Sequence, residues 1–389
     1  MPSLSIPSLP EPSAAERDHS ARVVEAVRAE IATSGGWIGF ARYMQIVLYA
    51  PGLGYYVAGA RKFGPGGDFV TAPETTGLFA QALAAQIAPI LAVTAAREII
   101  EFGAGSGALA ADLLNALAKL DALPSRYAIL EVSPDLRERQ RAHIARVAPE
   151  HGARIEWLDA LPARIDGAVV MNEVLDAIPP HLIVRRNGQW LERGVTCGAT
   201  LAWEDRPLGD ESLRSLAVER FPAAGDYVGE INPAAETLVE DVGRRMTGGA
   251  LLVIDYGFPQ AEYYHPQRGE GTLMGHYRHH AHANPFLWPG LSDLTAHVDF
   301  TAVALAGERA GLEVAGYAPQ AAFLLGCGIL DRLRETGDPK SIAYVREAAA
   351  VHKLTSPAEM GELFKVLALA KSDDIRWPGF TVADQSHRL

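Results

Sequence analysis

A repeated alternation of short apolar runs and helical segments, between residues 98 and 171, constrains the fold more than any other feature of the sequence. The run Glu98-Ile-Ile-Glu-Phe102 predicts a buried strand, and the Ala- and Leu-rich segment that follows it predicts a helix. Parallel strands joined by crossover helices give this order of elements. The sequence therefore predicts an α/β fold in which helices flank a mostly parallel, twisted sheet. The further strands are expected at 127–130, 154–158 and 167–171, and the helices at 107–119 and 134–147.

Other patterns flank this alternation and interrupt it. The pair Asn187-Gly188 lies between two alternating runs, which predicts a β-hairpin within an antiparallel insertion. Residues 249–257 then resume the sheet, whereas the His- and Pro-rich segment 262–292 is typical of a long loop. Towards the end of the chain, helices are expected around 300–310, 327–335, 340–352 and 357–371. The expected units are a flexible tail (1–12), an N-terminal helical and loop arm (13–96), a core (97–180 and 233–326), the antiparallel insertion (181–232) and a C-terminal helical region (327–389).

The turn after the first predicted strand, Glu101-Phe-Gly-Ala-Gly-Ser-Gly107, is typical of a ligand-binding loop. Glycines let the backbone approach a ligand closely, and the first free N–H groups of the following helix face it. The dinucleotide pattern G-x-G-x-x-G/A can be placed on Gly103, Gly105 and Ala108. However, Glu101 would repel an anionic pyrophosphate and would attract the sulfonium and ammonium groups of S-adenosylmethionine. The sequence therefore favours S-adenosylmethionine, with a dinucleotide site and a ligand-free structural turn as the alternatives.

Polar residues after the next strands extend this candidate cofactor site. Glu131 ends the second strand, where an acid can accept hydrogen bonds from ribose hydroxyls. Asp159 follows the third strand and is expected beside the adenine. The segments 43–56 and 63–74, which hold Tyr55, Tyr56, Asp68, Thr71 and Glu74, are expected to close over the cofactor as a lid. A solvated carboxylate at each position, and a packed structural arm, are the alternatives. The candidate cofactor-binding residues are Glu101, Gly103, Ala104, Gly105, Gly107, Glu131, Val132, Asp159, Ala160, Asn172, Thr71, Pro73 and Glu74.

Asn172, Glu173 and Asp176 follow the fourth strand and are the candidate catalytic residues. Ligands of open α/β sheets bind at the carboxyl ends of the strands. Two carboxylates there suit a cationic methyl acceptor, because a planar guanidinium is best held by bidentate carboxylate forks. In the alternative interpretation Asp176 caps a helix and Glu173 is a solvated loop residue.

Composition and motif spacing exclude several other classes of protein. With 35 basic and 47 acidic residues the formal charge is −12, which argues against binding to a nucleic-acid backbone. Only two cysteines, no long apolar run and no targeting segment indicate a cytoplasmic protein without a membrane span. The hydrolase pattern G-x-S-x-G requires a glycine two residues before and two residues after the serine. Around Ser106 these two positions are Ala104 and Ala108, so the pattern is absent there. The run from His276 to His282 has four histidines without an acid or cysteine at ligand spacing, so no metal is expected.

With these motifs together, the chain resembles the MidA-like S-adenosylmethionine-dependent methyltransferases, relatives of the mitochondrial complex I assembly protein-arginine methyltransferase. The resemblance implies a Rossmann-like class I methyltransferase fold with an antiparallel last strand and an extra helical and loop substrate region. It also implies S-adenosyl-L-methionine as the methyl donor. The residues that carry it are Leu48-Tyr-Ala-Pro-Gly-Leu-Gly-Tyr-Tyr56, Gly67-Asp-Phe-Val-Thr-Ala-Pro-Glu74, the loop 101–107, Tyr127-Ala-Ile-Leu-Glu-Val-Ser133, Asn172-Glu-Val-Leu-Asp176, Glu230-Ile-Asn-Pro233, Asp255-Tyr-Gly257, Gly271-Thr-Leu273, Pro289-Gly290, Asp293-Leu-Thr-Ala-His-Val-Asp-Phe300 and Met360-Gly-Glu-Leu-Phe-Lys365.

The leading functional hypothesis from the sequence is a protein-arginine N-methyltransferase. The mitochondrial members that the chain resembles are similar to an enzyme that symmetrically dimethylates an arginine of a respiratory complex I subunit. We therefore expect a protein partner that presents an arginine, and neither a nucleic acid nor a membrane as partner. A small-molecule methyltransferase and a non-catalytic assembly factor with a retained cofactor pocket are the alternatives, and a homodimer is one of the oligomeric states left open.

Overall fold

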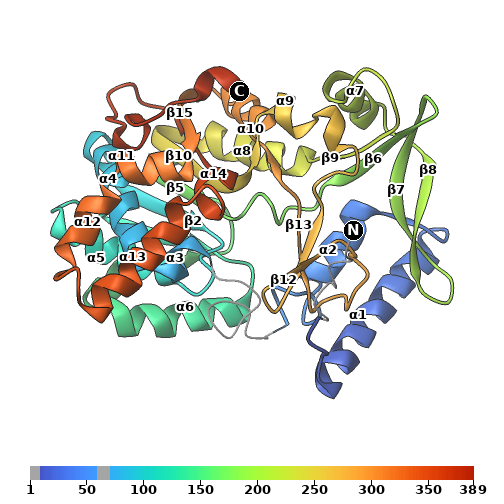
Figure 1. Ribbon diagram of the computed structural model, residues 1–389, viewed down its shortest axis with the longest axis horizontal. Coiled ribbons are helices and arrows are strands. Elements are labelled where there is room, and N and C mark those ends of the chain that lie inside the picture. The colour runs from blue at the N-terminus through green and yellow to red at the C-terminus, as the bar shows by residue number, and fades with distance from the viewer. Residues whose placement is uncertain (1–8, 59–70) are drawn as a thin grey trace.

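The computed structural model describes residues 9–58 and 71–389, and the largest sheet of that part of the chain has eight strands. This central sheet lies among helices in the left half of Figure 1. Its strand order is β15-β16-β10-β5-β2-β3-β4, with the short β14 beside β10. The expected α/β architecture with a mostly parallel sheet is confirmed. The strands are β2 (Glu98–Phe102), β3 (Arg126–Leu130), β4 (Ile155–Leu158), β5 (Ile165–Asn172), β10 (Met246–Phe258), β14 (Val298–Asp299), β15 (Glu313–Pro319) and β16 (Phe364–Ala370).

Strands β2, β3, β4, β5 and β10 run parallel, and helices form the crossovers from β2 to β3 and from β3 to β4, whereas residues 159–164 connect β4 to β5 without a helix. Helix α5 (Ala108–Lys119) follows β2, and helix α6 (Pro134–Val147) follows β3. These bounds agree with the predicted alternation. Every side chain of β2 is buried, as expected of a central strand that is covered on both faces.

Alternate side chains of the central strands pack into two separate apolar layers. Ile99 lies in the layer under α4 (Gly77–Val93), α5 and α12 (Ile329–Glu335). The neighbouring Ile100 lies in the layer under α8 (Pro233–Arg245) and α10 (Phe300–Arg309). This two-residue period is the geometry of a pleated strand. Both faces of the sheet are therefore closed, and the edge formed by the carboxyl ends of its strands is left to carry a site.

The helix that we expected at 357–371 is wrong for most of its length. Only α14 (Met360–Leu363) is helical, and the next seven residues form β16, which is antiparallel to both β10 and β15. All seven side chains of Phe364–Ala370 are buried. A short run that is buried on both faces has no hydrophobic period, so periodicity alone cannot separate strand from helix. The C-terminal region is thus partly a strand of the central sheet, and the antiparallel last strand implied by the resemblance is confirmed.

The antiparallel insertion forms a second sheet with the order β1-β7-β6-β9, and β8 pairs with β7. Asn187 and Gly188 both have positive φ, 49° and 76°, as the two-residue hairpin turn between β6 and β7 requires. The predicted hairpin is confirmed. The strands are β1 (Ile38–Gly39), β6 (His181–Arg186), β7 (Gln189–Cys197), β8 (Leu201–Pro207) and β9 (Tyr227–Ile231).

A third small sheet corrects the prediction of one long loop at 262–292. It has the order β12-β11-β13 and contains β11 (Met274–Tyr277), β12 (His280–His282) and β13 (Asp293–Thr295). Arg278 and His279 form the turn between β11 and β12 with positive φ of 47° and 63°. The sequence lacked the Asn-Gly signal that would have indicated this hairpin, because a non-glycine pair forms its turn.

The first part of the predicted N-terminal arm, residues 13–58, packs on the second and third sheets, whereas α4 at the end of that arm packs on the central sheet. Helix α1 (Ala14–Thr33) begins at Ser13, which forms a capping box with Glu16. Helix α1 agrees with the helical and loop arm that the sequence predicted from residue 13, but the sequence did not indicate α2 (Phe40–Tyr49), whose contacts include β6, β7 and β13. Within residues 9–58 and 71–389, no helix has both the length and the apolar character that crossing a bilayer requires. The remaining elements are α3 (Ala72–Thr75), α7 (Glu211–Arg220), α9 (Gln260–Tyr263), α11 (Gln320–Gly326), α13 (Ile342–Thr355) and the 3-10 turns Pro149–Arg154, Pro266–Arg268, Pro378–Phe380 and Ser386–Arg388.

Candidate functional site

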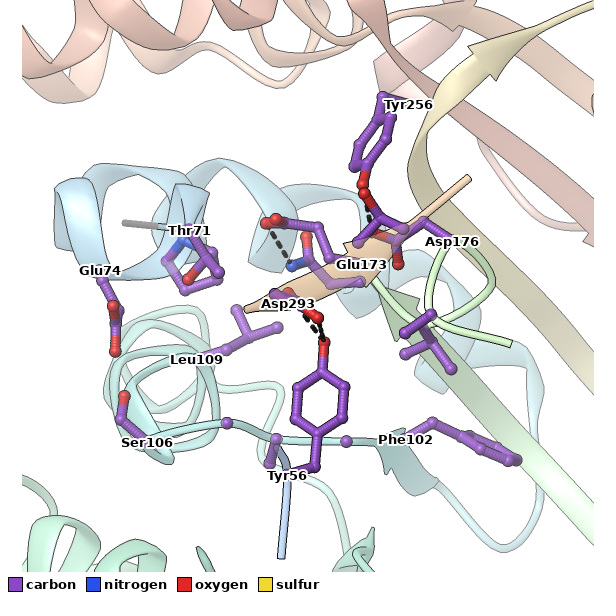
Figure 2. A pocket seen from close by; sticks show the side chains of 18 of the residues that line it. Tyr56, Thr71, Glu74, Phe102, Ser106, Leu109, Glu173, Asp176, Tyr256 and Asp293 are labelled. Carbon is purple, nitrogen blue, oxygen red and sulfur yellow. Dashed lines mark hydrogen bonds between the residues drawn. The ribbon is translucent and has the colours of Figure 1, made fainter. Parts of the chain in front are cut away.

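A cavity of about 760 Å³ lies where β2, β3 and β5 end (Figure 2). This is the position at which open α/β sheets bind ligands, and the volume lies within the roughly 300–1,000 Å³ of small-molecule and cofactor sites. The structure brings together most of the predicted site residues here. Those that line the cavity are Thr71, Pro73, Glu74, Glu101, Gly103, Ala104, Gly105, Glu131, Val132, Asn172, Glu173 and Asp176. Asp68, which we expected in the same lid segment, lies outside the described residues.

The glycine loop after β2 forms one wall of the cavity. Gly103 and Gly105 have positive φ of 58° and 52°, a conformation that other residues adopt only with strain. The N–H of Gly103 donates to the carbonyl of Leu130 at 3.0 Å, which joins the ends of β2 and β3. The loop then enters α5, whose first N–H groups are available to a ligand.

Gly107 has a different role from the one that we expected, because it does not line the cavity. It precedes α5 with a φ of 82°, and a Cβ atom there would lie 3.1 Å from the Cα atom of Gln140. Gly107 therefore allows α5 to approach α6. The spacing of the glycines did not distinguish a glycine needed for packing from one that faces a ligand.

Two buried acids line the half of the cavity next to the glycine loop. Glu101 accepts a hydrogen bond from the hydroxyl of Tyr127 at 2.7 Å, and burial raises the pKa of Glu101 to about 7. Glu131 accepts from the N–H of Ser133 at 2.9 Å and from Nε2 of Gln140 at 3.1 Å. Burial also raises the pKa of Glu131. A positively charged ligand would favour the ionised form of both acids.

Asp159 and Ala160 are exposed and do not line the cavity. The carboxylate of Asp159 pairs with Arg137 at 2.7 Å, and the same guanidinium donates to the carbonyl of Leu158 at 2.6 Å. Arg137 thus ties α6 to the end of β4. The prediction placed Asp159 from its position after the strand, and that position does not determine which way the side chain points.

The loop after β5 carries the candidate catalytic residues into the other half of the cavity. Glu173 has a φ of 53°, a left-handed conformation that is strained for a residue with a Cβ atom. Its N–H donates to the carbonyl of Ile254 at 2.8 Å, so the end of β10 holds this turn. Such strain persists only where the surroundings enforce it, and it is concentrated at functional sites.

The polar atoms of this loop are arranged to receive a ligand. Nδ2 of Asn172 donates to Oε1 of Glu173 at 3.3 Å. Among the described residues, Oδ1 of Asn172 and Oδ1 of Asp176 are buried without a hydrogen-bond partner. Burial and the nearby charge of Asp176 raise the pKa of Glu173 to about 8, and burial raises that of Asp176 to about 6. A cation at this position would favour ionisation of both acids, so the residues fit a positively charged ligand.

Aromatic and polar side chains complete this half of the cavity, and of these only Tyr56 was expected there, as part of the lid. The hydroxyl of Tyr256 donates to Asp176 at 2.6 Å, and that of Tyr56 donates to both oxygens of Asp293 at 2.9 and 3.0 Å (Figure 2). The ring of Tyr49 stacks on that of Tyr56. Asp293 belongs to a motif that carries the family resemblance, which is the one signal that could have identified it. Other lining residues come from the hairpin and the C-terminal region: Met274, His276, His279, Ala281, Lys353, Met360, Leu363 and Phe364.

The histidines of the run 276–282 all belong to the β11–β12 hairpin, but they do not all line the cavity. His276 and His279 line the cavity, whereas His282 contacts the hydroxyl of Ser292 at 3.1 Å. Within the described parts of the chain, no three His, Cys, Asp or Glu side chains are grouped as metal ligands would be. His297 also lines the cavity, and burial together with the charge of Arg268 lowers its pKa to about 4, so that its ring is neutral at physiological pH.

Comparisons with known proteins agree with this geometry. Residues 82–318 match the family described as an S-adenosyl-L-methionine-dependent methyltransferase. A crystal structure of a protein from Burkholderia thailandensis bound to S-adenosyl-homocysteine is 48% identical, covers 98% of this chain and 100% of that chain, and has a TM-score of 0.94. The protein arginine methyltransferase NDUFAF7, mitochondrial, of Homo sapiens is 29% identical over 86% of this chain and 80% of that protein. Its homolog in Drosophila melanogaster is 28% identical over 92% of this chain and 87% of that protein.

Proposed function

The chain belongs to the family of S-adenosyl-L-methionine-dependent methyltransferases, and on that premise we propose that it methylates an arginine side chain of a protein. The observation that carries the proposal is the pair of acids, the part-buried Glu173 and the buried Asp176, that lines the cavity beyond the glycine loop. The names of the mitochondrial relatives, which are protein arginine methyltransferases, support the same acceptor.

A guanidinium group matches this half of the cavity in shape and charge. It is planar, it stays protonated at physiological pH, and its N–H groups form a fork that fits a carboxylate. The buried Oδ1 atoms of Asp176 and Asn172 are acceptors that such a fork would satisfy. Binding of the cation would also lower the raised pKa values of Glu173 and Asp176. The attraction between the cation and the two carboxylates would then offset the free energy that their desolvation costs.

When bound, S-adenosylmethionine would supply a methyl group on a positively charged sulfur: the acceptor nitrogen would form a bond to the methyl carbon as the carbon–sulfur bond breaks, and S-adenosylhomocysteine would leave with the electron pair of that bond. The glycine loop and Glu131 would hold the cofactor, with Gly103 and Gly105 allowing close approach of the backbone. Glu173 and Asp176 would align the acceptor nitrogen and would take the proton that it loses. Tyr49 and Tyr56 cover this region and would limit the access of water. Positioning and charge placement would then account for most of the rate.

The resemblance of the motifs to the complex I assembly methyltransferase narrows the proposed acceptor to a subunit of the respiratory NADH:ubiquinone oxidoreductase. The test is incubation of the purified protein with methyl-labelled S-adenosylmethionine and a cell lysate. We expect label in a protein band that yields methylarginine on acid hydrolysis. The isosteric change Glu173→Gln should abolish this label while the affinity for S-adenosylhomocysteine changes by less than about twofold.

Glu219→Gln is the matched control, because Glu219 is an exposed residue of α7 outside the cavity. It should leave labelling unchanged. Label that appears only in small solutes would replace the proposal with a small-molecule methyltransferase. Cofactor binding without any label would favour a non-catalytic assembly factor, and labelling by Glu173→Gln at the wild-type rate would remove Glu173 from the mechanism.

A further inference from the structure

The motif Asp255-Tyr-Gly257 at the end of β10 has no role in the proposed chemistry, yet it contacts the loop that carries Glu173 and Asp176. Asp255 is fully buried and does not line the cavity. Its Oδ2 atom accepts from the N–H of Leu175 at 3.0 Å and from that of Asp176 at 3.3 Å. The Asp255 carboxylate therefore holds the backbone of the loop that bears the candidate catalytic acids.

Tyr256 holds the side chain of the same loop. Its hydroxyl donates to Oδ2 of Asp176 at 2.6 Å (Figure 2). Its own N–H donates to Oδ1 of Asp255 at 2.9 Å. The ring of Tyr256 meets that of His297 edge-on, with centroids 5.2 Å apart. Together with the carbonyl of Ile254, which accepts from the N–H of Glu173, three consecutive residues of β10 fix the loop.

The identity of residue 255 follows from this geometry. Both oxygens of Asp255 accept from backbone N–H groups, on two different sides of the carboxylate. An asparagine has one oxygen and one NH₂ group. At position 255 its NH₂ group would therefore point at a backbone N–H, and two hydrogen-bond donors cannot bond to each other. Burial and the charges of Asp176 and Glu173 raise the pKa of Asp255, whereas the backbone N–H groups of Tyr256 and Asp176 act to lower it, so these N–H groups favour the ionised form that accepts on both sides.

We propose that Asp255 and Tyr256 are positioning residues that hold the loop 172–177 in its strained, acceptor-binding conformation. Asp255 fixes the backbone of Leu175 and Asp176, and Tyr256 orients the carboxyl group of Asp176. This inference rests on the proposed function for the role of the acceptor. The arrangement itself is a property of this chain that can be tested without an acceptor.

The first test measures the ionisation of Asp176 by ¹³C NMR of its carboxyl carbon, assigned with Asp176→Asn. The hydrogen bond from Tyr256 favours the ionised form, so Tyr256→Phe should raise the midpoint of this titration by about half a pH unit or more. The other titratable groups around Asp176 are Glu173 on its own loop, Asp255 on β10, and Tyr49 and Tyr56 of the N-terminal arm. Tyr264→Phe, which removes a buried tyrosine hydroxyl outside the cavity, is the control and should leave the midpoint in place.

The second test uses two planar probes of equal shape, ethylguanidinium and the neutral ethylurea, with the protein saturated with S-adenosylhomocysteine. Wild-type protein should bind ethylguanidinium more tightly than ethylurea. Asp255→Asn should weaken ethylguanidinium binding about tenfold or more and leave the affinity for S-adenosylhomocysteine within about twofold. Asp299→Asn is the control, because the carboxylate of the part-buried Asp299 also accepts a backbone N–H, from Ala302, but it lies outside the cavity.

The outcomes separate the two proposals. An unchanged Asp176 midpoint in Tyr256→Phe, or wild-type ethylguanidinium binding by Asp255→Asn, would overturn the positioning role. A wild-type protein that binds both probes equally would instead overturn the guanidinium acceptor, and the NMR titration would still decide the role of Tyr256. Should Asp255→Asn fail to fold, the titration of Tyr256→Phe decides alone, because that substitution keeps the ring and its packing.

Discussion

The ionisation of Glu173 links the proposed site to a measurable property of the whole protein. Its pKa is about 8 in the folded chain, whereas a glutamate in water has a pKa of about 4.5, so between these pH values the folded chain holds a proton that the unfolded chain has lost. The folded state therefore loses stability as the pH rises through this interval. Glutamine does not titrate, so Glu173→Gln should become progressively more stable than wild type from pH 5 to pH 8, by at most about 1.4 kcal/mol per pH unit. Chemical unfolding of both proteins without cofactor at pH 5, 6.5 and 8 measures this, and parallel stability curves would show that Glu173 ionises normally.

Among individual residues, the sequence predicted correctly those that reach the cavity simply because they directly follow a strand. Asn172, Glu173 and Asp176 follow the end of a central strand, so knowledge of the strand was enough to bring them to the cavity. Asp159 also follows a strand, but its side chain turns outward to Arg137. Side-chain direction after a strand depends on the local turn, and a single sequence does not give it. Roles in cofactor or acceptor binding stay predictions for all of these residues.

Strand β16 is the element for which a substitution gives the clearest test of the fold. Leu367 is fully buried and pairs in register with Val253 of β10 and Tyr317 of β15. Leu367→Ala removes packing from the sheet centre and should lower the free energy of unfolding by about 2–5 kcal/mol. Val382→Ala is the control, because Val382 is 57% exposed and its loss should cost no more than about 0.5 kcal/mol. Equal, small effects of the two substitutions in urea unfolding would contradict the central position of β16.

Elements with a strong local signal were predicted well, and elements defined by distant pairing were not. The helices α1, α5 and α6 have caps or apolar periodicity in their own sequence, and the β6–β7 hairpin has its Asn-Gly turn. In contrast, β16 is a strand because it pairs with β10 on one side and with β15 on the other, and both of these strands are distant from it in sequence. The hairpin of β11 and β12 likewise depends on β13, which completes its sheet. These pairings are tertiary interactions, and no periodicity within the segments themselves encodes them.

On the scale of the whole molecule, the cavity joins segments from nearly the entire chain, from Tyr49 in the N-terminal arm to Phe364 at the start of β16. A ligand that binds only this assembled cavity must stabilise the fold as a unit, because the unfolded chain has no such site. S-adenosylmethionine at about 100 times its dissociation constant should add about 2.7 kcal/mol, which for a chain of this length raises the unfolding temperature by roughly 3 °C. Gly103→Arg should abolish this shift, because residue 103 lines the cavity at a φ of 58° and the new side chain would add bulk and positive charge there.

The matched control for that substitution is Gly36→Arg. Gly36 has a φ of 84° and open space around its Cβ position, so the variant has a similar backbone strain without an obstruction of the cavity. Both variants should therefore unfold at a lower temperature than wild type, but only Gly36→Arg should recover the shift on addition of S-adenosylmethionine. Calorimetry and thermal unfolding of the three proteins provide the comparison. A full shift in Gly103→Arg would mean that the cofactor binds elsewhere, and the assignment of the glycine loop as its site would then fail together with the roles built on it.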